Sequence, residues 1–121
     1  MRIWLHFLIW TVAAVADAQA AQNVQAGREL AIDACSACHQ VTPDQKPRPP
    51  VFNTDEQTNV TAPAFSVVAK KYAGRPSALR KFILAPTHPM REQIWAPVDL
   101  TAVVAFIQSL NQPASAPRTG R

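Results

Sequence analysis

The chain has 121 residues, 48% of them hydrophobic and 17% charged, and its net charge is +4 at neutral pH. This length allows one small domain and excludes a large catalytic fold. The positive charge is mild and no nucleic-acid recognition motif accompanies it, so nucleic acid is not an expected partner.

The first twenty residues have the pattern of a secretory signal peptide. Arg2 gives a positive start, residues 3–16 are mostly apolar, and two overlapping Ala-x-Ala triplets end at residues 18 and 20. The apolar run contains polar interruptions and is shorter than the ~20 residues that a membrane-spanning helix needs, although a retained anchor is the alternative. We expect residues 1–20 to be cleaved, which leaves the net charge at +4 because Arg2 and Asp17 are lost together.

The next segment predicts a helix from about Val24 to Cys35, with Asn23 as its N-cap. Its apolar and small residues recur at helical spacing, at Val24, Gly27, Leu30, Ala31 and Ala34. Glycine costs about 1 kcal/mol relative to alanine inside a helix, so Gly27 calls for a reason in the packing.

The helix leads into Cys35-Ser36-Ala37-Cys38-His39, a C-x-x-C-H motif. This spacing is typical of covalent haem attachment, in which each thiol adds to one vinyl group and the histidine Nε2 binds the iron. The chain has two cysteines in all, and attachment of one haem would use both.

Two other kinds of site share these residues. Cys35 and Cys38 could form a disulfide or a thioredoxin-like redox pair, although the βαβ pattern that accompanies such a pair is missing. A structural zinc site needs four ligands, and here it would have to recruit the distant His88.

Prolines punctuate the rest of the chain and delimit three more helices. A proline-rich loop covers residues 43–50. Helices are then predicted from Phe65 to Tyr72, which Pro63 precedes and Gly74 ends, and from Pro76 to about Ala85.

The fourth helix has the clearest pattern. Its apolar positions follow Pro97 at i, i+3, i+4 and i+7 spacing, at Leu100, Val103, Val104, Ile107 and Leu110. Residues 113–121 carry no large apolar side chain and predict a disordered tail. We therefore expect an all-α domain of about four short helices over residues 21–112, built around one covalently attached haem.

A C-x-x-C-H motif between terminal helices resembles the class I c-type cytochromes, and the resemblance covers about residues 24–110. In that family a small residue of the first helix lets an aromatic residue of the last helix cross it closely. Gly27 and Phe106 stand in the matching positions.

The resemblance also implies a methionine as the second iron ligand. Met90 is the only methionine that remains once residues 1–20 are removed, and it precedes Phe106 at about the family's spacing, although Arg91 stands where the family commonly has proline. His88 is the rival ligand, and a methionine that merely fills the core is the plain alternative. Methionine ligation predicts a higher reduction potential than two imidazoles would.

Further cofactor contacts follow from the same resemblance. The carbonyl of Pro63, in Ala62-Pro63-Ala64-Phe65, is expected to accept a hydrogen bond from the second ring nitrogen of His39, with Pro49 and Pro50 as alternatives. Donors for the haem propionates are expected from side chains elsewhere in the sequence, namely Arg48, Tyr72 and Trp95.

The resemblance implies a periplasmic monohaem electron carrier that meets a redox donor and a redox acceptor, with no enzymatic activity and most simply a monomer. Cations in the middle of the chain could steer it toward acidic docking surfaces; they are Lys70, Lys71, Arg75, Arg80 and Lys81. A haem subunit of a dehydrogenase or oxidase complex and a haem-based gas sensor are the alternative functions.

Overall fold

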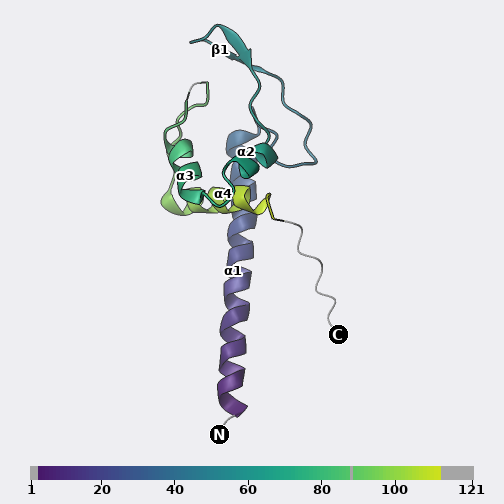
Figure 1. The fold of residues 1–121 in the computed structure, drawn as a ribbon, viewed down its shortest axis with the longest axis vertical. Helices are drawn as coiled ribbons and strands as arrows, with labels where there is room; N and C mark the ends of the chain where they lie inside the picture. The colour runs from purple at the N-terminus through teal and green to yellow at the C-terminus, as the bar shows by residue number, and fades with distance from the viewer. Residues whose placement is uncertain (1–2, 88, 113–121) are drawn as a thin grey trace.

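A computed structural model describes the backbone of residues 3–87 and 89–112 and the side chains from residue 18 onward. Four helices and one small hairpin follow in chain order: α1 (Ile3–Cys35), β1 (Val51–Asn53), β2 (Thr58–Val60), α2 (Phe65–Lys71), α3 (Pro76–Leu84) and α4 (Pro97–Ser109). Figure 1 shows α1 as a long rod, with α4 crossing its upper part and α2 and α3 packed nearby. The predicted tail at residues 113–121 and the rival ligand His88 lie outside the described residues.

The first helix is longer than predicted. It begins at Ile3 rather than Val24, so Asn23 lies inside it and is not an N-cap. The physical reason is that residues 13–22 are rich in alanine and contain neither glycine nor proline, so nothing in the local sequence ends a helix there. Residues 18–23 are exposed, and the helix becomes part of the domain only from about Val24. Within the described residues, no helix is long and apolar enough to cross a membrane.

The other three helices confirm the prediction to within about a residue at most boundaries. Pro76 and Pro97 occupy the first helical turns of α3 and α4, where a missing N–H costs nothing. Tyr72 ends α2, and Gly74 then adopts a φ of 67°, the left-handed conformation that glycine enters without strain.

The predicted all-α domain of about four helices is confirmed, and the small hairpin is an addition that was not predicted. β1 pairs antiparallel with β2, Val51 opposite Val60 and Asn53 opposite Thr58. The Asn53 side-chain Oδ1 accepts hydrogen bonds from the backbone N–H groups of Asp55 and Glu56, at 3.0 and 3.4 Å, and so organises the turn.

The core lies where α1 crosses α4. A Cβ built on Gly27 would stand 1.9 Å from the carbonyl oxygen of Ala102 and 2.9 Å from the nitrogen of Val103. Glycine therefore lets the two backbones meet directly, one helical turn before the buried Phe106. The fully buried side chains around this crossing include Ala31, Val103 and Ile107.

Candidate functional site

The C-x-x-C-H motif forms a tight turn at the end of α1. The backbone N–H groups of Cys38 and His39 both donate to the carbonyl of Cys35, at 3.2 and 2.9 Å. The turn folds the motif back, so that Cys35, Cys38 and His39 all line the same cavity. Both cysteines are free thiols, which does not support the disulfide alternative.

The two thiols differ in their surroundings. Burial raises the pKa of the Cys35 thiol to about 11, with a smaller contribution from the neighbouring Cys38. Cys35 is therefore protonated at neutral pH, as a thiol set against apolar side chains should be.

The imidazole of His39 is held in one orientation. Its Nδ1 lies 2.7 Å from the carbonyl oxygen of Pro63, and because a carbonyl can only accept, Nδ1–H donates. The Phe65 ring packs against the imidazole at a centroid distance of 5.3 Å, and the Phe65 N–H donates to the Gln40 carbonyl at 2.9 Å. The hydrogen bond between His39 and Pro63 was expected from the family resemblance. It uses Nδ1 and leaves Nε2 free to bind a metal ion. Of the prolines considered, Pro63 lines the cavity and Pro49 and Pro50 do not.

The cavity has a volume of about 630 Å³, within the range of sites for a ligand of a few dozen atoms. Its wall is predominantly apolar and draws on every described element of the domain. The lining residues are Ala34, Cys35, Ala37, Cys38, His39, Val51, Val60, Ala62, Pro63, Phe65, Val68, Leu79, Phe82, Ile83, Thr87, Pro89, Met90, Arg91, Gln93, Trp95, Val103 and Ile107.

Met90 reaches this cavity from the loop between α3 and α4. A turn in which the Met90 N–H donates to the Thr87 carbonyl at 3.2 Å shapes the approach, and Pro89 stiffens it. Met90 and His39 therefore contribute a thioether and an imidazole to the same space, from segments fifty-one residues apart in the chain.

The three predicted propionate donors do not gather at one place. Trp95 lines the cavity, and its Nε1–H is buried without a hydrogen-bond partner. The Nε of Arg48 is also buried without a partner, but Arg48 is not among the described residues that line the cavity. Tyr72 is absent from the lining as well and packs against Phe82 instead, at a centroid distance of 6.0 Å.

Several lining residues were not identified from the sequence, among them Arg91, Gln93, Val51 and Val60. Arg91 and Gln93 follow Met90 directly, and the Gln93 side-chain amide donates to the Ala34 carbonyl at 3.3 Å, which ties this loop to the end of α1. Polar residues beside a predicted ligand were a usable signal for both. Val51 and Val60 enter through the hairpin, and three-residue strands leave too short a pattern to be found.

The residues present suit a haem better than a bare metal ion. Two thiols and an oriented imidazole line an apolar cavity. The buried Trp95 N–H on the same wall has no hydrogen-bond partner, and a haem propionate could accept from it. Among the described residues, no group of three or more His, Cys, Asp or Glu side chains could hold a metal ion, and His88, which the zinc alternative requires, lies outside them.

Comparison with known families matches residues 24–111 to the family described as cytochrome c. Comparisons with curated proteins and with solved structures give no match. The matched range starts where α1 joins the domain and ends just beyond α4, so it takes in every element that lines the cavity.

Proposed function

The chain belongs to the cytochrome c family, whose members carry covalently attached haem c and transfer electrons with it. We propose that this protein is a periplasmic monohaem electron carrier. The observation that carries the proposal is the convergence of Cys35, Cys38, His39 and Met90 on one apolar cavity. When bound, haem c supplies an iron that cycles between Fe(II) and Fe(III).

Each residue of this set has a separate role in the proposal. Cys35 and Cys38 form the thioether links, His39 binds iron through Nε2, and Met90 binds it through its thioether sulfur. The hydrogen bond from His39 Nδ1 to Pro63 fixes the plane of the imidazole and increases its basicity as a ligand. Trp95 Nε1–H is the best placed of the three expected donors for a propionate.

The ligand set argues for electron transfer without bond chemistry. A haem iron bound by both the His39 imidazole and the Met90 thioether would have no position open for a substrate. The apolar wall would limit the access of water to a bound haem, which reduces the reorganisation that accompanies a change of one charge. We therefore propose that the protein is not an enzyme.

The location and partners are part of the same proposal. Residues 1–20 act as a cleaved signal that directs the chain to the bacterial periplasm, where residues 21–112 form the functional domain. The partners are a redox donor and a redox acceptor with acidic docking surfaces, which the net charge of +4 favours. We propose a monomer as the working form, since one domain contains every expected haem-binding side chain and haem attachment needs no second copy.

The test is a redox titration of the exported holoprotein, combined with its mass. We expect a mass equal to the cleaved chain plus one haem that denaturation does not remove, and a reversible one-electron transition. Haem that is lost on denaturation, or a protein that turns over a substrate at the iron, would contradict the proposal. Variants in which Cys35 or Cys38 is replaced by Ala should retain one link or none, whereas Ala37→Ser, at the exposed residue between them, should leave both links in place.

A further inference from the structure

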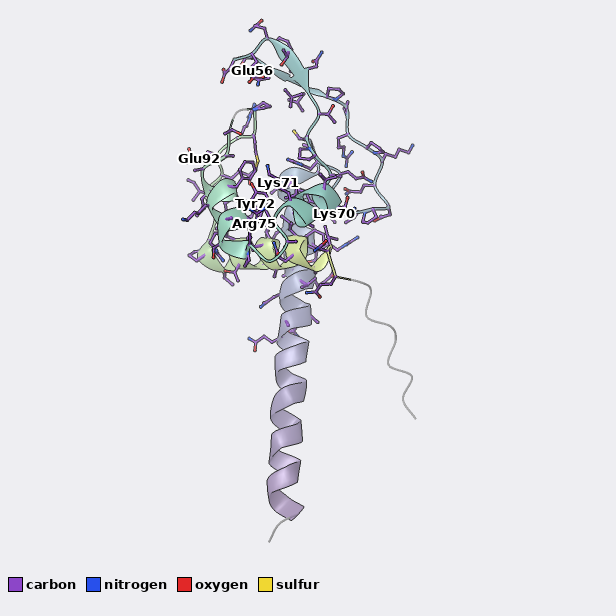
Figure 2. The ribbon with its side chains drawn as sticks, viewed as in Figure 1. Glu56, Lys70, Lys71, Tyr72, Arg75 and Glu92 are labelled. Carbon is purple, nitrogen blue, oxygen red and sulfur yellow. The ribbon has the colours of Figure 1, made fainter. Side chains whose placement is uncertain are left out.

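The cations in the middle of the chain are not evenly spread over the surface, and one group of them surrounds an aromatic ring. Residues 61–91 contain six Lys or Arg and no Asp or Glu, so no carboxylate in that stretch offsets their charge. Figure 2 shows Lys70, Lys71, Tyr72 and Arg75 together where α2 meets α3, whereas Glu56 lies on the hairpin and Glu92 on the loop before α4.

Tyr72 lies at the centre of this group. The Lys71 Nζ stands 5.5 Å from the centroid of the Tyr72 ring and the Arg75 guanidinium carbon 5.7 Å from it, so two cations flank one ring. Val67 precedes Lys70 and Lys71 by about one helical turn and is 55% exposed, which adds an apolar neighbour on the same helix. We call Val67, Lys70, Lys71, Tyr72 and Arg75 the Tyr72 corner.

The backbone holds the Tyr72 corner rigidly. The Tyr72 carbonyl accepts a hydrogen bond from the Arg75 N–H at 2.9 Å and another from the Gln108 side chain of α4 at 2.9 Å. The Arg75 guanidinium donates to the Lys71 carbonyl, and Gly74 supplies the left-handed residue that the turn needs. A surface that is fixed before binding loses little entropy when a partner docks.

The Tyr72 corner is also connected to the haem cavity. The Tyr72 ring packs on Phe82 at a centroid distance of 6.0 Å, and Phe82 lines the cavity. One aromatic side chain therefore separates the cation-flanked ring from the space that the haem occupies. By contrast, Arg80 is engaged elsewhere, because it donates to the Thr101 hydroxyl of α4 at 2.7 Å.

Resting on the proposed function, we propose that the Tyr72 corner is the docking surface for an acidic redox protein and that one electron crosses between partner and haem beside Tyr72 and Phe82. The partner presents carboxylates to Lys70, Lys71 and Arg75 and an apolar patch to Tyr72 and Val67. Such an interface is small and short-lived, as repeated electron delivery requires. One electron leaves the ferrous haem, one oxidised centre of the partner accepts it, and no proton or bond changes hands.

The experiment uses two small oxidants of opposite charge on the reduced holoprotein, anionic hexacyanoferrate(III) and cationic tris(1,10-phenanthroline)cobalt(III). Lys71→Gln and Arg75→Gln remove one charge each, and Lys46→Gln is the control, because Lys46 is an exposed lysine of the loop 43–50, outside α2 and α3. For a triply charged probe at about 10 Å, one charge changes the rate about four-fold at 10 mM salt, about two-fold at 0.15 M, and hardly at 1 M.

We expect Lys71→Gln and Arg75→Gln to slow oxidation by the anionic probe and to speed oxidation by the cationic probe. Lys46→Gln should change both rates less. Opposite responses separate lost steering from damage to the fold, which would slow both probes. Equal effects in all three variants, or none at 10 mM salt, would overturn the proposal.

A second arm tests the ring. Tyr72→Leu should slow both probes even at 1 M salt, whereas Tyr72→Phe keeps the contact with Phe82 and should match the parent protein. Parent-like rates in Tyr72→Leu would show that electrons cross elsewhere. A redox titration of every variant tests the carrier function separately from the docking surface. A reversible one-electron transition together with parent-like rates in every variant would support the carrier function and overturn the docking surface.

Discussion

The direct contact of α1 with α4 at Gly27 makes a sharp prediction about Gly27→Ala. An added methyl group would stand 1.9 Å from the Ala102 carbonyl oxygen, whereas ordinary contact begins at 3.4 Å, so the two backbones must separate by the difference, 1.5 Å. The obstacle is backbone on both sides, so no side chain can turn away. Overpacking of this kind typically costs 1–3 kcal/mol.

Two terms oppose each other in this variant. Alanine is better than glycine in a helix by about 1 kcal/mol, and the clash must exceed that gain before the protein is destabilised. A separation of more than 1 Å also loosens the packing around Ala31 and Phe106, which puts the clash near the upper end of the overpacking range, at about 3 kcal/mol. After the helix-propensity gain is subtracted, the net loss is about 2 kcal/mol, and for a domain of this size that corresponds to a fall in Tm of roughly 8–16 °C.

The assay is thermal and urea unfolding of the holoprotein, with Gly74→Ala as the matched control. Gly74 has a φ of 67° and open space where a Cβ would stand, so alanine there meets strain without a clash and should cost about 1 kcal/mol. If Gly27→Ala were as stable as the parent, or less harmful than Gly74→Ala, the close crossing of α1 and α4 would be refuted.

Two further predictions concern the core and the hairpin. Phe106→Ala should lower the free energy of unfolding, measured by urea denaturation, by about 3–5 kcal/mol, because Phe106 is 3% exposed. Phe52 is 53% exposed, so Phe52→Ala should cost far less. Similar losses in the two variants would contradict the observed burial. Asn53→Ala removes the acceptor of the Asp55 and Glu56 amides, and a loss of about 1.4 kcal/mol would speed their hydrogen exchange about ten-fold. Unchanged exchange of those two amides would mean that other contacts organise the turn.

The sequence was informative about helices wherever proline or glycine marks a boundary. Pro76 and Pro97 begin α3 and α4, and Gly74 follows α2, because these residues constrain the backbone wherever they stand. The start of α1 was wrong for the opposite reason, since an alanine-rich stretch contains nothing that ends a helix.

The candidate site was predictable to the extent that its chemistry is local. Cys35, Cys38 and His39 are close in sequence, and a short motif therefore identifies them without knowledge of the fold. Tyr72 was expected as a donor to a haem propionate, and that role stays a prediction; its ring packs on Phe82 outside the lining, and a helical pattern does not show which surface an aromatic ring faces. Val51 and Val60 reach the cavity through the pairing of two strands across a turn. Each strand has three residues, which is too short for an alternating pattern to be recognised in the sequence.

The central claim is that one haem is held between His39 and Met90, and the absorption spectrum of the oxidised, exported protein tests it most directly. Methionine-ligated ferric haem shows a weak band in the far red. We expect the parent protein to have this band, Met90→Ala to lose it, and both proteins to keep a covalently bound haem. A parent spectrum without the band, or a band that survives Met90→Ala, would contradict the assignment of Met90 as the second ligand.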